Sequence, residues 1–199
     1  MSIYGNSHRQ IQDSFDSRRL ADKMEEFNVH VELTDAEVEF VESREMFFLA
    51  SVDANGHLNN SYKGGAPGVL KVLNRRTVAF PNYDGNGMYL STGNVSATGE
   101  VALLLIDFQN PTRTRINGTA TVSADDPLLE DWPGANLVVR VTTREVFTNC
   151  PRYIHKMEFV DRSRDIPSSE YTPPIAEWKK VGALREVLPA NDPALAEDV

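Results

Sequence analysis

The stretch that decides the fold is residues 47–94, FFLASVDANGHLNNSYKGGAPGVLKVLNRRTVAFPNYDGNGMYLSTGN. Its first six residues, Phe47–Val52, form a continuous apolar run, which predicts a buried strand. Asp53–Gly56 then supplies a hairpin turn, because Asn and Gly tolerate a positive φ. The next predicted strand, His57–Lys63, is polar for its position. A polar strand in a small sheet faces either solvent or a ligand, so this strand marks a candidate site.

Two strand ends in this stretch break down into small and polar residues. The first is Ser61–Gly65 (SYKGG), and the second is Phe80–Tyr83 (FPNY), which runs into the turn Asp84–Gly87 (DGNG). Such ends let a backbone approach a ligand closely and offer it N–H groups. We therefore expect the two ends to form one wall of a site for a phosphate-bearing cofactor. The residues alone leave alternatives open: a surface role for Lys63, a plain turn at Asp84–Gly87, and Arg113 and Arg115 as the outward residues of an alternating strand.

The remaining pattern predicts a mainly β chain, a β-barrel with peripheral helices. Further strands are expected over Val69–Leu73, Thr77–Phe80, Val101–Phe108, Arg113–Val122 and Leu137–Phe147. Helical spacing or helix-start signals predict helices over Ser7–Phe27, Thr34–Ser43, Gly87–Asn94 and Asp125–Trp132, and a helical turn opened by Pro151. Strands and helices do not alternate as in βαβ units, which favours a mostly antiparallel barrel over a doubly wound sheet.

The chain is expected to consist of one domain with two extensions. Residues 1–32 form a helical extension that packs on the domain or on a partner subunit, and residues 33–160 form the barrel domain. Residues 161–199 are punctuated by prolines, and only Ile175–Leu188 has a helical pattern. We expect this tail to wrap the domain or a partner.

Composition excludes several classes of function. Apolar residues make up 41% of the chain and charged residues 25%, as is usual for a globular protein. The net charge of -9 argues against nucleic-acid or anionic-membrane binding, which needs a basic surface. No apolar run is long enough for a membrane span, and the N-terminal residues lack the apolar core of a signal peptide. A single cysteine, Cys150, suits a reducing compartment, so we expect a cytoplasmic protein.

No standard catalytic or metal motif is present. The four histidines, His8, His30, His57 and His155, have no metal-ligand spacing and no cysteine partner. The sequence contains no nucleophile elbow, phosphate-binding Walker loop or zinc-protease helix motif. From the residues alone, the chain is a β-barrel domain with one anion-binding edge, and no catalytic residue can be named.

The order of five short segments resembles a known family. FFLASVDANG, SYKGG, VAFPNYDGN, VALLLIDF and TRINGTATV follow one another as in the pyridoxamine 5'-phosphate oxidase-like family of FMN-binding split β-barrels. The resemblance covers about residues 33–155 and is greatest to the family's uncharacterised branch. It implies a six-stranded antiparallel Greek-key split barrel, an obligate homodimer, and two FMN molecules in grooves between the subunits.

Carried over position by position, the resemblance also implies flavin-binding residues. These are Ser61, Tyr62, Lys63 and Gly64 along the flavin, Phe80, Pro81 and Asn82 at the ring and ribityl chain, and Gly85, Asn86 and Gly87 at the phosphate. Arg113 matches a polar residue that reaches the flavin from the following hairpin, and Arg115 lies beside it. Tyr153 and His155, after the last strand, could reach the open face of a partner's flavin.

The sequence departs from the genuine oxidases in two places. They carry an Arg-Lys pair at the phosphate turn, where this chain has Asn86 and Gly87, and an arginine-rich C-terminal segment that this chain lacks. Phosphate charge would come instead from Lys63, Arg113 or Arg115. We therefore expect an FMN-dependent oxidoreductase of unknown substrate, working by hydride transfer, and not the enzyme that makes pyridoxal phosphate. The alternatives are a non-catalytic FMN binder or carrier, or a relative that binds a deazaflavin or haem.

Overall fold

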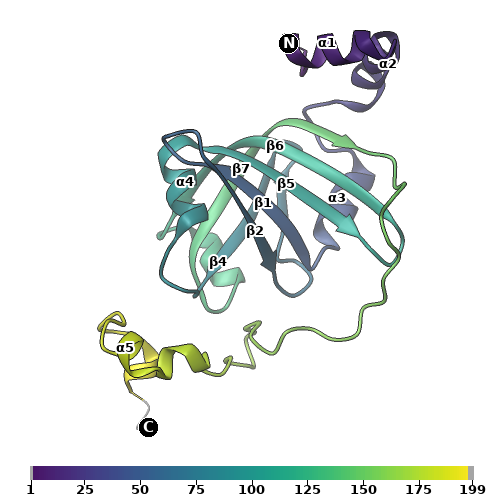
Figure 1. Cartoon of the computed structure of the whole chain (residues 1–199). Helices are drawn as coiled ribbons and strands as arrows, with labels where there is room; N and C mark the ends of the chain where they lie inside the picture. The colour runs from purple at the N-terminus through teal and green to yellow at the C-terminus, as the bar shows by residue number, and fades with distance from the viewer. Residues whose placement is uncertain (1, 197–199) are drawn as a thin grey trace. The chain divides into compact units, whose positions relative to one another are not determined.

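The computed structural model describes residues 2–196, which divide into two compact units, Met1–Val160 and Asp161–Val199. The first unit holds every long strand and four of the helices (Figure 1). Within residues 2–196, no helix combines the length and the apolar character needed to cross a bilayer. Each unit is described by itself below.

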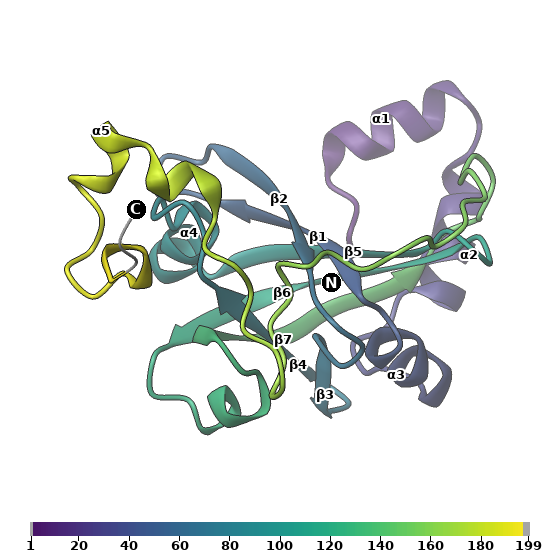
Figure 2. The same cartoon turned by 90° about the horizontal axis from the view of Figure 1, so that it is seen from below.

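The first unit is built on one antiparallel sheet of seven strands. These are β1 (Met46–Val52), β2 (Leu58–Gly64), β3 (Lys71–Asn74), β4 (Thr77–Tyr83), β5 (Glu100–Asp107), β6 (Thr112–Ser123) and β7 (Ala135–Thr148). Their order in the sheet is β2-β1-β5-β6-β7-β4-β3, so the chain crosses from one end of the sheet to its middle between β4 and β5. The sheet curls into a barrel with β2 and β3 as unpaired edges (Figures 1 and 2).

This architecture confirms the predicted split barrel of mainly antiparallel β structure, with one correction. The barrel has seven strands and not six, because the four residues of β3 pair with β4 as a separate short strand. A bulge at Val72–Asn74 keeps β3 short, so it forms only a small edge of the sheet.

Strict alternation along the central strands creates the core. In β1 and β5 the odd-numbered residues, such as Phe47, Leu49 and Leu103, are buried, and the even-numbered ones face outward. The rings of Phe47 and Phe80 meet edge to face with centroids 4.9 Å apart and join β1 to β4. One face of the sheet therefore closes on itself, and the other face is left outside the barrel.

The helix α3 (Asp35–Glu42) begins with the predicted capping box. The Thr34 hydroxyl accepts a hydrogen bond from the Glu37 N–H at 3.3 Å, and the Glu37 carboxylate accepts one from the Thr34 N–H at 2.9 Å. His30 Nε2 lies 2.8 Å from the same carboxylate. The cap thereby ties the start of α3 to the segment that precedes it.

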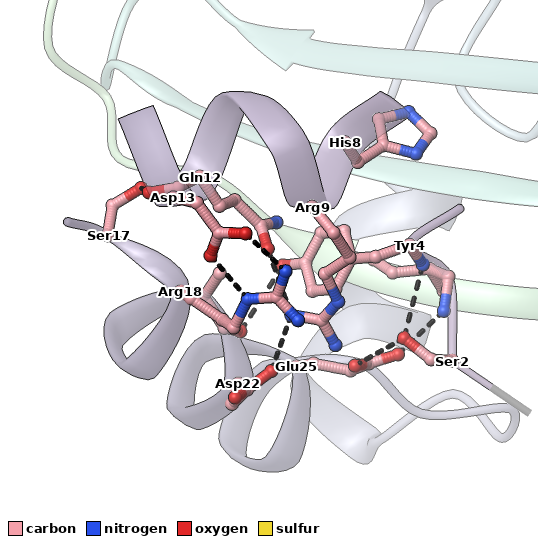
Figure 3. Close-up of polar contacts among 12 residues, drawn as sticks. Ser2, Tyr4, His8, Arg9, Gln12, Asp13, Ser17, Arg18, Asp22 and Glu25 are labelled. Carbon is pink, nitrogen blue, oxygen red and sulfur yellow. Dashed lines mark hydrogen bonds and ion pairs between the residues drawn. The ribbon is translucent and has the colours of Figure 1, made fainter. Parts of the chain in front are cut away.

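The N-terminal residues form two helices instead of the single helix predicted over Ser7–Phe27. They are α1 (Asn6–Ser14) and α2 (Arg18–Asn28), and the break lies at Asp16, whose φ is +48°. The Ser17 N–H then bonds the Gln12 carbonyl at 2.8 Å, which reverses the chain. We call α1 and α2 together the N-terminal hairpin; Figure 3 shows the polar contacts between its helices.

Three other predicted helices differ in position or kind. The helix expected over Gly87–Asn94 is α4 (Leu90–Thr98), which starts later and ends at Gly99 with φ +72°. The expected helix in the insertion is a single 3-10 segment, Pro127–Asp131. Pro151 opens a single turn that is not helical, because Tyr153 has φ +72°, and an Ile154 N–H to Pro151 carbonyl hydrogen bond of 3.0 Å closes it.

The second unit is short and contains little regular structure. The expected helix over Ile175–Leu188 is divided into a 3-10 turn, Glu177–Lys180, and one short helix, α5 (Gly182–Arg185), and another 3-10 turn follows at Pro193–Leu195. A buried ion pair of 2.7 Å between Lys179 and Asp192 joins these turns. Pro174 and Pro189 bound the segment, and within it the extended Val181, just before Gly182, separates the two pieces.

Candidate functional site

A cleft of about 360 Å³ lies where β2 and β4 end. Both predicted strand ends line it, together with the loop 84–89 and the first turn of α4. Its lining includes Phe47, Asn59, Ser61, Tyr62, Lys63, Gly64, Val69, Pro81, Asn82, Tyr83, Asp84, Gly85, Asn86, Gly87, Met88, Tyr89, Leu90, Ser91 and Thr92. The size falls within the range of roughly 300–1,000 Å³ typical of small-molecule sites.

The polarity of β2 is explained by the cleft. The inward row of β2 is Asn59, Ser61 and Lys63, at positions where β1 presents core residues. Ser61 Oγ lies 2.6 Å from Ser91 Oγ at the start of α4, and the Asn59 amide donates to both hydroxyls, at 3.3 and 3.4 Å. These bonds fix the edge strand against the helix and form a polar floor to the cleft.

Lys63 is the cationic group of the cleft. The residue is half-buried, and burial lowers the pKa of its ammonium group. No carboxylate among residues 2–196 forms an ion pair with it. A partly desolvated cation without a counter-charge favours the binding of an anion.

The start of α4 adds further anion-binding capacity. No side chain caps this N-terminus, so its first backbone N–H groups have no partner within the helix. Leu90, Ser91 and Thr92 at this first turn line the cleft on which Lys63 also lies. A helix N-terminus and a lysine in one cleft are suited to a phosphate group.

The loop 84–89 is held over the cleft by a bridge from β7. Tyr89 adopts φ +48°, an uncommon conformation for a residue with a side chain. The Asn136 amide donates to the Tyr89 hydroxyl at 3.2 Å, and the Asn136 carbonyl oxygen accepts from the Asn82 amide at 2.9 Å. Within the loop, Asn86 Oδ1 accepts from the Met88 N–H at 3.1 Å. Asn136 thus joins both sides of the opening.

The structure gathers most of the predicted site residues in this cleft. Nine of the twelve line it: Ser61, Tyr62, Lys63, Gly64, Pro81, Asn82, Gly85, Asn86 and Gly87. Phe80 lies in the core behind it, packed on Phe47, and it is Phe47 that reaches the cleft. Arg113 and Arg115 do not line the cleft of their own chain.

Arg113 and Arg115 lie on the outward side of β6. The Arg115 guanidinium donates to Asn149 Oδ1 and lies 5.8 Å from the centre of the Phe147 ring. Burial, and then the neighbouring charge of Arg113, lower the pKa of Arg115. Arg113 Nε is buried and has no hydrogen-bond partner among the described residues.

The outward side of the sheet carries a second, more apolar hollow of about 760 Å³. We call this surface the outer sheet face and define it by six residues: Phe48, Ala50, Leu58, Ala102, Leu104 and Phe147. It lies on β1, β2, β5 and the end of β7, with Arg115 and Asn117 at its border. An apolar surface of this kind on a globular protein marks an interaction site.

The segment after β7 brings no further group to the cleft. Cys150, Tyr153 and His155 are all exposed, and none lines the cleft. No group of three or more His, Cys, Asp or Glu side chains that could hold a metal ion is found within residues 2–196. The predicted role of Tyr153 or His155 at a partner's flavin stays a prediction.

Sequence reasoning missed the residues that support the cleft from other elements. Asn59, Ser91, Tyr89 and Asn136 were not predicted, although the polarity of His57–Lys63 already pointed to Asn59. Ser91 and Thr92 had a weaker signal, as small hydroxyl residues a few positions after a glycine-rich turn. Asn136 carried no signal in the sequence, because its partners Asn82 and Tyr89 lie 54 and 47 residues away along the chain.

Comparisons with known proteins agree with this geometry. The profile of a family described as "Pyridoxamine 5'-phosphate oxidase" matches residues 33–153, which include both strand ends, α4 and Asn136. No curated protein matches the chain.

Solved structures resemble parts of the chain. A candidate pyridoxamine 5'-phosphate oxidase from Lactobacillus delbrueckii is 26% identical with a TM-score of 0.49, covering 59% of this chain and 95% of its own. The haem storage protein HutZ from Vibrio cholerae is 18% identical with a TM-score of 0.41, and the two coverages are 55% and 89%. An FMN-binding protein from Syntrophomonas wolfei is 14% identical with a TM-score of 0.38, and the coverages are 70% and 97%.

The family profile spans more than half of the chain and includes the whole cleft. The chain therefore belongs to the pyridoxamine 5'-phosphate oxidase family.

Proposed function

We propose that this protein is an FMN-binding oxidoreductase, acting as a homodimer on a small-molecule substrate. The observation that carries the proposal is the cleft between β2, β4 and α4, where an unpaired, half-buried lysine and an uncapped helix N-terminus lie together. Membership of the family supports a flavin as the ligand, because the match covers every residue of this cleft.

The residues of the cleft fit the two chemically different ends of FMN. A phosphate dianion needs cations and backbone donors, which Lys63, the glycine-rich turn Gly85–Gly87 and the start of α4 supply. A flat ring system needs apolar walls, which Tyr62 and Pro81 offer. The polar floor of β2 provides hydrogen bonds between these ends.

Bound FMN would supply the redox chemistry, by accepting or donating a hydride. The protein's own residues would hold FMN in position and exclude water from one side of the flavin. The half-buried position of Lys63 strengthens its interaction with an anion, because fewer water molecules compete with it. Asn136 would keep the loop 84–89 closed over the ligand through Tyr89.

A second copy of the chain would complete the site. Arg113 and Arg115 were predicted to reach the flavin, yet they lie on the outward side of β6, away from the cleft of their own chain. In a homodimer these cations would approach the cleft of the partner. Their lack of acidic partners within residues 2–196 supports that role.

FMN is favoured over haem by the chemistry of the lining. None of the described residues that line the cleft is a histidine or a cysteine, the usual haem ligands. A haem would have to use Met88 or one of the lining tyrosines as its axial ligand, whereas FMN needs the cation and the backbone donors already there.

Purification of the native chain tests the proposal. We expect the visible absorption of a flavin, with one FMN per chain released on heating, and oxidation of a pyridine nucleotide or another donor by the flavin. A colourless protein that does not bind added FMN would refute the proposal. If FMN is bound but no donor reduces it, the protein is an FMN carrier and not an oxidoreductase.

A further inference from the structure

The N-terminal hairpin has its charged residues between the helices and its apolar residues outside. Arg9 of α1 pairs with Asp22 of α2 at 2.6 Å, and Arg18 pairs with Asp13 at 2.6 Å (Figure 3). Neither helix contains a buried residue. Amphipathic helices in proteins are stabilised mainly by packing of the apolar side, and this pair has no such packing against the other described residues of its own chain.

The exposed apolar residues form what we call the hairpin stripe: Ile11, Phe15, Leu20, Met24 and Phe27. Phe15 is 79% exposed and Phe27 78%. Because an aromatic side chain buries about 150–250 Å², the stripe offers roughly 500 Å² of apolar surface. A stable interface buries about 800 Å² on each partner, so the stripe alone falls short and needs an additional contact.

The outer sheet face is the complementary surface, and the hairpin is attached at its border. The Asn28 amide at the end of α2 donates to the Thr148 carbonyl at 2.6 Å, and the Thr148 hydroxyl donates back to the Asn28 side chain at 2.9 Å. His30 pairs with Val146 through two backbone hydrogen bonds. Between these two anchors lies Phe147, a member of the outer sheet face. From there the hairpin projects away from the barrel (Figures 1 and 2). The side chains of its stripe are exposed.

We propose that the N-terminal hairpin is an arm that docks on the outer sheet face of a second copy of this chain. The inference rests on the homodimer of the proposed function and adds the arm to it. One chain presents both the stripe and an apolar face that the stripe does not cover. In a two-fold dimer each copy would bury both its hairpin stripe and its outer sheet face. The area buried on each copy is then about twice that of the stripe alone, which is enough for a stable interface. A different protein would have to match two separate surfaces.

Variants of the full chain test the arm. Phe15→Glu with Phe27→Glu changes the stripe, Leu58→Glu changes the outer sheet face at an 80% exposed position, and a third variant combines all three changes. Val160→Glu with Val187→Glu is the control, since it adds the same charges at apolar positions that are 92% and 76% exposed. Sedimentation velocity gives the dimer dissociation constant, thermal unfolding verifies the fold, and FMN content is measured in each sample.

We expect the stripe variant and Leu58→Glu each to weaken the dimer at least about 30-fold, and the control to change it little. Because the altered residues would face each other, the combined variant should be weakened by clearly less than the product of the separate effects. A stripe variant that dimerises like the control would overturn the arm. So would a combined variant whose loss of affinity equals the product of the two separate losses, because the two surfaces would then not contact each other. In either case a dimer with normal FMN content would leave the proposed function intact. A wild-type chain that is monomeric throughout would overturn both the arm and the proposed homodimer.

Discussion

Replacing Lys63 with methionine is expected to have opposite effects on stability and on cofactor binding. The substitution removes the ammonium group and keeps a long apolar side chain in its place. Burial lowers the pKa of Lys63, and no carboxylate within residues 2–196 pairs with it. In the cofactor-free protein the folded state therefore holds this proton less tightly than the unfolded chain does, and the charged form opposes folding.

The pH dependence has a definite sign. Below the lowered pKa of Lys63 the charge costs stability in full, and the cost disappears as pH rises toward the value of about 10.4 in an unfolded chain. Lys63→Met should thus raise the melting temperature of the cofactor-free protein at pH 7, and the gain should shrink toward pH 10. Calorimetry at both pH values measures this difference.

FMN binding should change in the other direction. A hydrogen bond to a charged group contributes roughly 1.5–3 kcal/mol, so losing it should raise the dissociation constant about 10- to 150-fold. Titration of the cofactor-free protein with FMN measures the loss, and Lys156→Met, at an exposed lysine outside the cleft, is the control. An unchanged affinity would remove Lys63 from the site, and a lowered melting temperature would show that its charge has a partner in the fold.

Three other substitutions test the fold and the loop. Gly118→Ala should lower the free energy of unfolding by about 3 kcal/mol in a denaturant titration, because the added Cβ would collide with a backbone carbonyl on β7; an unchanged midpoint would contradict this. The bonds from Arg140 hold the pKa of Asp126 below its usual range, so Asp126→Asn should cost roughly 1 kcal/mol at pH 7. Its difference from wild type in thermal unfolding should shrink as pH falls through about 3.9, where the unfolded carboxyl takes up a proton, and should be lost only below the lower pKa of the folded carboxyl; a constant difference would argue against the ion pair. Asn136→Ala should speed FMN release about fivefold in stopped-flow fluorescence by freeing Tyr89, and an unchanged rate would exclude Asn136 as the residue that holds the loop.

The strands of this fold could be predicted because each carries its signal locally. Asn55 and Gly56 mark the first hairpin, and Gly56 does adopt a positive φ of +85°. Burial of one side only sets the alternation along β6, and this alternation is visible in the order of its apolar and polar residues. The polarity of β2 was enough to identify the candidate cleft, because three polar side chains on one side of a strand, Asn59, Ser61 and Lys63, are not expected to point into an apolar core.

Contacts between distant segments were not predictable. The helix break at Asp16 lies in a segment without Gly or Pro, and the turn depends on a hydrogen bond from Ser17 to Gln12 and on ion pairs between the helices. Asn136 has a role only because β7 lies beside β4, a pairing of strands far apart in the chain. The polarity pattern of α1 and α2 predicted a packed apolar side, but not which surface covers it.

The central claim is that the cleft binds a flavin through its phosphate. The most direct test is titration of the cofactor-free protein with FMN and with riboflavin, which has the same ring and no phosphate. If Lys63 and the start of α4 hold the phosphate, FMN should bind at least about 100-fold more tightly, since two charge-assisted contacts are lost with riboflavin. Equal affinity for the two flavins, or binding of neither, would contradict the claim.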